Sequence, residues 1–488
     1  MEEKSTLCVK INLPGGVASA GDLFEILLIA ENAGAASISI GNRQQLYFEI
    51  PTDSVDDLET DMLKADISYE IDNDLFPNII SSYVADNIFN TESWLKEGVY
   101  KDIFDMFTFK PRLKINLVDQ HQTFAPFFSG NFNFISSPVS NYWYFYVRFP
   151  KTSDLYCWPS LVYSDDIPLI SRIAEDVILT HKHLFYDQQE IKHRSFYKLV
   201  TTGNEFLSQP IIDALKLPDF YLPYYEGINK YANGRYWLGV YRRNESFPLE
   251  FLKDICSACL KTRVGQLYTT PWKSLLIKGI KEGDRADWGD ILNKYQVNVR
   301  HASNELNWQL ENLCQESLEL KKQLVREFEE HDLRTYRLCF AIKMQPKTGL
   351  LGSIIIKKQD ARLFDILYTK DFNPNSKDFI IYKEKVHVNE LGKWLIELCG
   401  FYYGLLIDNS ISKSPKIAPA GEGAVAEPVS MVYQCKNCLS IYDEVYGDSV
   451  QNVPINTGFE TLDNYLCPVC ESPKEDFRLI EKKVCFKL

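Results

Sequence analysis

The clearest chemistry in the sequence lies in four cysteines near its C-terminus. Cys435 and Cys438 form one C-x-x-C pair, and Cys467 and Cys470 form a second. Two sulfurs three residues apart can bind one metal ion from a single tight turn, which we call a knuckle. Two facing knuckles complete a tetrahedral four-sulfur site. Zinc and iron are the metals that favour such a site. The spacing therefore predicts a metal centre and leaves the choice between these two metals open.

The segment between the knuckles bears on that choice. Zinc ribbons place about 15–20 residues there, whereas residues 439–466 form a clearly longer loop. A domain of this size is too short to be stable on a hydrophobic core alone, so the metal and packed aromatic side chains must support it. The aromatic residues that fit this core are Tyr442, Phe459, Tyr465 and Phe477.

Residues 431–480 resemble a rubredoxin. The likeness rests on both knuckles, on the aromatic residues and on the motifs Gly447-Asp448, Gly458-Phe459 and Cys467-Pro468-Val469-Cys470. It implies a small, mostly irregular β domain in which the four cysteines bind one iron atom. It also implies a one-electron carrier that cycles between the ferric and ferrous states. A zinc-ribbon interaction protein without redox function is the alternative, and the longer loop and the aromatic set count against it.

Two positions depart from the rubredoxin pattern. Leu439 and Glu471 stand where the family has a glycine after each knuckle. A residue with a side chain is unfavourable in the left-handed conformation that this position requires. We therefore expect either strain or altered geometry there. Either outcome affects the reduction potential, because hydrogen bonds from amides to sulfur tune it.

Composition limits the class of protein. The chain has 488 residues, which predicts two or three domains. Its net charge of −13 argues against nucleic acid and against an anionic membrane as partners. No apolar run is long enough to span a bilayer, and the acidic N-terminus does not resemble a signal peptide. Because four thiolates must be loaded with metal while reduced, a cytoplasmic location is expected.

The C-terminal domain is predicted to be tethered to the rest of the chain. Residues 408–430 are rich in Ser, Pro, Ala and Gly, which predicts a flexible linker. Such a tether raises the local concentration of one module at the other. We therefore divide the chain into a first half at 1–180, a second half at 181–407, the linker at 408–430 and the rubredoxin-like domain at 431–480.

The two N-terminal halves contain a repeat of strand, helix and strand. Leu23, Ile26, Leu27 and Ala30 recur at helical spacing between a strand at Val9–Leu13 and an extended segment at Ser37–Ile50. The same order of strand, helix and extended segment occurs again later in the chain. The second strand is predicted at Tyr236–Tyr241 and the second extended segment at Leu267–Ile280. The helix between them has an apolar face formed by Leu252, Ile255, Cys256 and Cys259. The repeat predicts α+β architecture. Cys256 and Cys259 have the spacing of a redox pair, but their place on the apolar face favours core packing.

The halves resemble the paired ferredoxin-like halves of the siroheme-dependent sulfite and nitrite reductases. The segments that carry the likeness are Gly15-Gly16, Asn42-Arg43-Gln44-Gln45, Pro111-Arg112-Leu113-Lys114 and Thr270-Pro271-Trp272-Lys273-Ser274. The resemblance implies that Arg43 and Lys114 belong to a pocket for an anion or a siroheme-like group. The predicted fold class is thus α+β, with duplicated ferredoxin-like half domains of siroheme-reductase type and a small C-terminal rubredoxin-like domain.

The cysteines of the second half depart from that family. The reductases hold a four-iron cluster with two cysteine pairs, whereas the corresponding stretch of this sequence has Cys314 and Cys339, each alone. A cluster needs four thiolates, so neither a four-iron–four-sulfur cluster nor siroheme is expected. The leading hypothesis is an electron-transfer protein on a reductase-like scaffold. A divergent siroheme reductase of nitrite or sulfite, with a built-in rubredoxin donor, is the enzymatic alternative.

The charge of the C-terminal domain predicts the kind of partner. Between Cys435 and Arg478 there are eight acidic residues and three basic ones. The acidic residues are Asp443, Glu444, Asp448, Glu460, Asp463, Glu471, Glu475 and Asp476. An acidic surface favours docking on a basic patch of a redox partner protein.

Overall fold

A computed structural model of the chain describes residues 5–90, 93–231, 234–346, 349–413 and 431–481, apart from 439, 445, 446, 449, 450, 452 and 455. The chain forms two compact units, Met1–Asp408 and Asn409–Leu488. The last helix of the first unit, α11 (Leu391–Lys413), continues through 408–413, which the sequence assigned to the linker. Residues 414–430 of that predicted linker lie outside the described residues.

Two five-stranded antiparallel sheets form the base of the first unit, and each takes one strand from the other half of the chain. The first sheet has the order β15-β3-β4-β1-β5, and the second has the order β13-β14-β17-β16-β2. In the first sheet the strands are β15 (Ser246–Pro248), β3 (Ser37–Ile40), β4 (Leu46–Pro51), β1 (Thr6–Ile11) and β5 (Tyr69–Ile71). In the second they are β13 (Gly227–Tyr231), β14 (Arg235–Val240), β17 (Leu275–Ile280), β16 (Gln266–Thr269) and β2 (Val17–Ser19). The strands β2 and β15 are therefore exchanged between two equivalent sheets.

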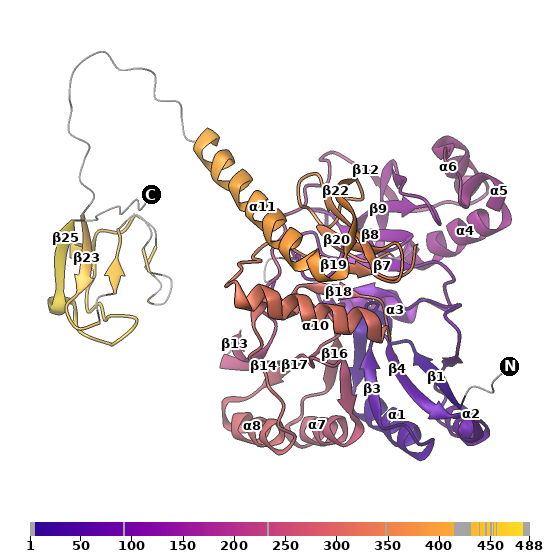
Figure 1. The fold of residues 1–488 in the computed structure, drawn as a ribbon, viewed down its shortest axis with the longest axis horizontal. Helices are drawn as coiled ribbons and strands as arrows, with labels where there is room; N and C mark the ends of the chain where they lie inside the picture. Colours follow the sequence, from indigo (N-terminus) through magenta and orange to yellow (C-terminus); the bar gives the residue numbers. More distant parts are fainter. Residues whose placement is uncertain are drawn as a thin grey trace, which may run out of the picture. The chain divides into compact units, whose positions relative to one another are not determined.

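Helices from both halves cover these two sheets together. They are α1 (Ala20–Asn32), α2 (Val55–Lys64), α7 (Leu249–Thr262) and α8 (Arg285–Lys294). Figure 1 shows α1 beside α7, and the two helices are in contact. The helix α1 begins after Ser19, whose hydroxyl accepts a hydrogen bond from the Asp22 amide at 3.0 Å. Cys256 and Cys259 are fully buried in the shared core, and burial raises the pKa of each thiol to about 12, as expected for core residues.

Two further sheets repeat a second pattern, in which three parallel strands continue into antiparallel ones. One follows the order β12-β11-β9-β8-β7-β6, with β10 paired to β9, and the other follows β18-β19-β20-β21-β22. The strands of the former are β6 (Ile80–Ser81), β7 (Ile115–Val118), β8 (Phe132–Ser136), β9 (Tyr142–Arg148), β10 (Leu155–Cys157), β11 (Ser160–Tyr163) and β12 (Ser208–Pro210). Those of the latter are β18 (Trp308–Leu310), β19 (Phe340–Lys343), β20 (Ile354–Lys358), β21 (Leu363–Thr369) and β22 (Phe379–His387). The duplication thus extends well beyond the repeat of strand, helix and strand.

The remaining helices complete the first unit. They are α3 (Glu97–Asp105), α4 (Ile167–Thr180), α5 (Lys182–Phe185), α6 (His193–Thr201), α9 (Ser303–Leu306) and α10 (Gln315–Glu330). The helices α10 and α11 lie along the sheet that contains β18–β22 and share its apolar core (Figure 1).

The two extended segments predicted at Ser37–Ile50 and Leu267–Ile280 are each broken by a turn, and in this respect the prediction was wrong. The Gln44 amide donates to Gly41 O at 2.9 Å, and the Lys273 amide donates to Thr270 O at 3.1 Å. Gln44 and Lys273 both adopt positive φ, at 66° and 55°. The turns do contain turn-forming residues, Gly41 and Asn42 in the first and Pro271 in the second, and the prediction passed over them. The two turns occupy equivalent places in the duplicated sheets.

The C-terminal unit is a small β domain built on an aromatic core. Its antiparallel sheet has the order β24-β23-β25, formed by β23 (Met431–Cys435), β24 (Ile441–Tyr442) and β25 (Phe477–Glu481). The aromatic residues predicted from the sequence, Tyr442, Phe459, Tyr465 and Phe477, are buried in one cluster with Cys435 and Cys467. This small core encloses the buried sulfurs of the two knuckles.

A close backbone approach in the first unit yields a test of this fold. A Cβ atom on Gly239 of β14 would lie 1.9 Å from the Tyr225 carbonyl oxygen, so Gly239→Ala forces backbone to move. We expect the free energy of unfolding to fall by about 1–3 kcal/mol, measured by thermal melts followed by circular dichroism. Gly289→Ala on α8 is the control, because nothing lies within 4 Å of the added carbon. Equal melting temperatures for the two variants would contradict the packing of Tyr225 on β14.

Candidate metal centre and scaffold cavities

The structure brings all four predicted cysteine ligands together. Cys435 is the last residue of β23 and Cys438 lies on the turn that follows, whereas Cys467 and Cys470 lie on a second turn before β25. All four sulfurs lie within 4.8 Å of one another. The distance is 3.4 Å from Cys438 Sγ to Cys467 Sγ and 3.7 Å from Cys435 Sγ to Cys470 Sγ. A tetrahedron with metal–sulfur bonds of about 2.3 Å has edges of about 3.8 Å, so this geometry fits one tetrahedral metal ion.

The two knuckles share one backbone design. The Cys435 amide donates to Ser440 O at 2.9 Å, and the Cys467 amide donates to Ser472 O at 2.8 Å. Glu471 adopts a φ of 58°, which is the left-handed conformation expected at this position. Because Glu471 has a side chain, this conformation is energetically unfavourable compared with the glycine of the family. Leu439, the corresponding residue of the first knuckle, lies outside the described residues.

Hydrogen bonds favour thiolates at this site. Burial raises the pKa of Cys467, but donors from the Ser440 hydroxyl and from the Val469 and Cys470 amides outweigh burial and lower it to about 6. For Cys435, the Cys438 amide is the main donor that lowers the pKa. A ligand that loses its proton readily binds metal more tightly, since metal displaces that proton.

The pKa of Cys470 moves the other way. The Ser472 hydroxyl lowers it, but the adjacent Cys438 and Cys467 sulfurs and burial raise it to about 11. Several thiolates this close repel one another unless a cation lies between them. The four sulfurs therefore require a cation in order to be fully deprotonated together.

Two serines that the sequence analysis did not single out line the sulfurs. Ser440 Oγ lies 3.0 Å from Cys467 Sγ, and Ser472 Oγ lies 3.0 Å from Cys470 Sγ. Each serine follows the second cysteine of its knuckle by two residues. The repeated pattern C-x-x-C-x-S was the sequence signal that could have identified them.

In the first unit, Arg43 and Lys114 line the same cavity of about 240 Å³. The Arg43 guanidinium is already occupied by the protein, because it donates to Asn78 O at 2.7 and 3.0 Å and to Ile115 O at 2.8 Å. Burial lowers its pKa to about 9. Arg43 therefore holds together the backbone segments around the cavity.

Lys114 differs from Arg43 in its bonding. Burial, and then the positive charge of Arg43, lower the pKa of Lys114. Within the described part of the chain, its ammonium group makes no hydrogen bond or ion pair. Lys114 is thus the cation of this cavity that can accept an anion.

Cys314 and Cys339, the two single cysteines in the stretch that corresponds to the cluster ligands of the reductases, lie in different surroundings. Cys339 precedes β19, is fully buried, and its thiol lies 3.6 Å from Leu351 O. Burial also raises its pKa. Cys314 instead lines a separate cavity of about 510 Å³. The next cysteine after Cys339 is Cys399, which lies on α11 and is buried in the core that this helix shares with the sheet.

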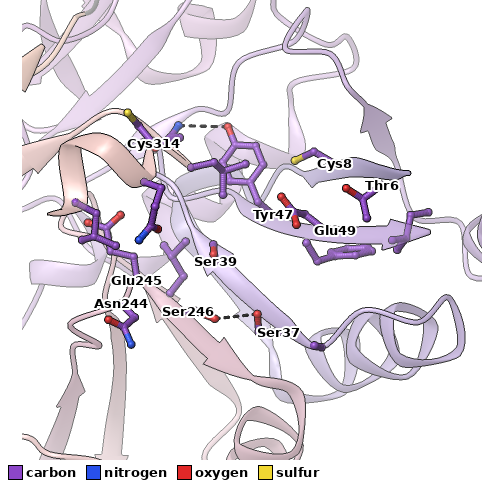
Figure 2. A pocket seen from close by; sticks show the side chains of 18 of the residues that line it. Thr6, Cys8, Ser37, Ser39, Tyr47, Glu49, Asn244, Glu245, Ser246 and Cys314 are labelled. Atoms are coloured by element: carbon purple, nitrogen blue, oxygen red, sulfur yellow. Dashed lines mark hydrogen bonds between the residues drawn. The ribbon is translucent and has the colours of Figure 1, made fainter. Parts of the chain in front are cut away.

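This second cavity lies on one face of the sheet that contains β1, β3 and β4. Figure 2 shows Cys8, Tyr47 and Glu49 on its wall, with a hydrogen bond between the hydroxyls of Ser37 and Ser246 at 2.8 Å. The Tyr47 hydroxyl also accepts from Asn312 Nδ2 at 3.3 Å. The wall is mostly neutral and polar, so it offers no concentrated charge to a ligand.

No helix in the described ranges has both the length and the apolar character needed to cross a bilayer.

Comparison with known proteins separates the two units. The rubredoxin family model matches residues 432–477. Probable Rubredoxin-1 of Methanocaldococcus jannaschii is 40% identical over 74 residues, which is 14% of this chain and 92% of that protein. Rubredoxin-2 of Chlorobaculum tepidum is 41% identical over 49 residues, 10% of this chain and 94% of that protein.

The larger unit has a structural relative. The NirA protein of Mycobacterium tuberculosis shares 12% sequence identity with this chain at a TM-score of 0.62, over 85% of this chain and 83% of that one. At that identity the likeness concerns the fold alone. It confirms the α+β fold that the sequence predicted for the larger unit. Through its C-terminal domain the chain belongs to the rubredoxin family, and that domain is fused to an α+β scaffold with the fold of the NirA protein.

Proposed function

We propose that this protein is an electron carrier whose redox centre is a rubredoxin-type iron site. The observation that carries the proposal is the convergence of Cys435, Cys438, Cys467 and Cys470 within 4.8 Å, in a domain of the rubredoxin family. When bound, iron supplies a ferric–ferrous couple that takes up and releases one electron. The cysteines hold it as thiolates, and the knuckle amides and serines stabilise their negative charge. Cytoplasmic location is part of this proposal, since the site must be loaded while its thiols are reduced.

The exposed edge of the centre is where we place electron exchange. Cys435 and Cys467 are buried, Cys438 is partly buried and Cys470 is exposed. Exposed apolar side chains next to the knuckles surround this edge, namely Ile441 (58% exposed), Leu466 (43%) and Val469 (70%). Together with the acidic residues of the domain, they suit a redox partner protein with a basic patch around an apolar centre.

The scaffold is proposed to act without a cluster or a tetrapyrrole of its own. Cys339 is buried against the Leu351 carbonyl, and Cys314 lines a different cavity. The cavity at Arg43 and Lys114, at about 240 Å³, is smaller than the roughly 300–1,000 Å³ typical of pockets for drug-sized ligands. These features support a small anion as its ligand, or a role for the scaffold as a docking platform.

A divergent siroheme reductase is the second candidate. It is favoured by the fold shared with the NirA protein and by the meeting of Arg43 and Lys114 at one cavity. Siroheme has a visible spectrum distinct from that of an iron–tetrathiolate, so absorption spectra separate the two candidates. One iron per chain and no tetrapyrrole favour the carrier.

The metal centre is tested by reconstitution with iron under reducing conditions. We expect the full-length protein to become coloured with one iron atom per chain, and Cys467→Ala to lose both colour and iron, because three thiolates no longer close the site. Absorption spectra and metal analysis measure this. Cys157→Ala is the control, since this exposed cysteine lies far from the knuckles in sequence and in another domain. Wild-type protein that stays colourless and binds only zinc would refute the carrier proposal.

The scaffold cavity is tested by anion binding. We expect Lys114→Gln to weaken sulfite or nitrite binding at least tenfold in isothermal titration calorimetry with little change in melting temperature, because the Lys114 ammonium group lines the cavity and has no hydrogen bond or ion pair among the described residues. Since its pKa is lowered, its charge is lost at a lower pH than for an ordinary lysine. Anion affinity should therefore fall as the pH rises towards the usual lysine value of about 10.4.

Lys64→Gln is the matched control, because this side chain is 70% exposed on α2. If Lys114→Gln and Lys64→Gln bound anions equally well, the cavity would have no role in anion binding.

A further inference from the structure

We infer that the hydroxyl groups of Ser440 and Ser472 donate hydrogen bonds to the cysteine sulfurs and raise the reduction potential of the iron site. This inference rests on the proposed iron centre and concerns residues of this chain that adjust it.

Each serine contacts a different part of the sulfur cluster. Ser440 Oγ lies 3.0 Å from Cys467 Sγ and 3.2 Å from Cys438 Sγ, so it touches one sulfur from each knuckle. Ser472 Oγ lies 3.0 Å from Cys470 Sγ. Each hydroxyl has one proton, so Ser440 can donate to Cys467 and Ser472 to Cys470, which gives each of these two sulfurs a hydroxyl donor.

The hydrogen-bond network decides which atom donates. A metal-bound thiolate carries no proton and can only accept, so a hydroxyl beside it must donate. Asn437 Nδ2 donates to Ser472 Oγ at 2.8 Å and to Asp476 Oδ2 at 3.0 Å. The Ser472 oxygen therefore accepts from Asn437, and its own proton remains for Cys470.

The backbone holds both serines in place. Ser440 O and Ser472 O accept the amide hydrogens of Cys435 and Cys467, the first cysteines of their knuckles. The knuckle fold therefore fixes the backbone of both serines beside the sulfurs, and the bond from Asn437 also holds the Ser472 hydroxyl. Ser472 is only 8% exposed. A hydrogen bond in such a place is weakened less by water than one at the surface.

The electrostatic consequence has a definite sign. Reduction adds one negative charge to the site, and the sulfur atoms share it. A donor aimed at sulfur stabilises the reduced state more than the oxidised state, which raises the potential. Loss of one charge-assisted hydrogen bond should lower the equilibrium constant for reduction on the order of tenfold, which is about 59 mV for one electron.

The experiment measures the midpoint potential of iron-reconstituted full-length protein by spectroelectrochemical titration, with the electrode as electron source. We expect Ser440→Ala and Ser472→Ala each to lower the potential, and the double variant to lower it most. Iron content should be unchanged, and the sulfur-to-iron absorption bands should move to longer wavelength. Ser440→Thr keeps a hydroxyl and should restore most of the potential.

Thr461→Ala is the matched control in the same domain, because the Thr461 hydroxyl donates to Gly458 O at 2.7 Å. Its potential should equal that of the wild type. Alanine variants that load iron with an unchanged or higher potential would overturn the inference while leaving the electron-carrier proposal intact. Wild-type protein that binds no iron would overturn both.

A second measurement needs no variant. In protein loaded with NMR-active cadmium, the hydroxyl protons of Ser440 and Ser472 should exchange slowly with water and show scalar coupling to the metal through the bonded sulfur. Rapidly exchanging hydroxyl protons without that coupling would overturn the inference even if the alanine variants failed to fold.

Discussion

Four sulfur atoms held within 4.8 Å of one another repel each other as thiolates unless a cation lies among them. The rest of the C-terminal domain follows from this constraint. Its buried core consists of a few aromatic rings and two of the cysteines themselves, so the apolar surface available to stabilise the fold is small. Metal binding must supply much of the folding free energy, and the ligand set and the fold are therefore inseparable. The pKa of Cys467 is lowered and that of Cys470 is raised. The two shifts have opposite signs because a negative charge on one sulfur makes a charge on its neighbour less favourable.

The larger unit depends on a different constraint. Because β2 pairs with β16 and β15 pairs with β3, neither half can complete its sheet without the other. The exchange also places the equivalent turns at Gln44 and Lys273 in the same core of the molecule, where they have diverged. Gln44 Nε2 donates to Thr269 O at 2.9 Å, next to the other turn, whereas Lys273 forms an ion pair with Glu245 at 2.5 Å. Gln44 therefore joins the two halves, whereas the Lys273–Glu245 pair lies within the second half.

Arg43 has a structural role in the scaffold. Arg43 lies where the family resemblance expects an anion-binding arginine, yet backbone carbonyls occupy its guanidinium. Unpaired buried carbonyls are costly, so these contacts make Arg43 hard to replace whether or not a ligand binds. The Lys114 ammonium group makes no comparable hydrogen bond to the backbone in the part of the chain that the structure describes. Arg43 thus stabilises the fold, and Lys114 is the residue that could still bind an anion.

What the sequence determined by itself is the chemistry that spacing encodes. The C-x-x-C pairs, the aromatic core around them and the helical periodicity of α1 and α7 are all local patterns, and they identified the metal ligands and the repeat. Contacts between distant segments were decided by the tertiary structure alone. Strand exchange, the meeting of Arg43 with Asn78 and Ile115, and the approach of Ser440 to Cys467 each join residues that are far apart in the chain. The physical reason is that a side chain's local sequence sets its chemical type and periodicity, whereas its partners, burial and pKa arise only after the chain has packed.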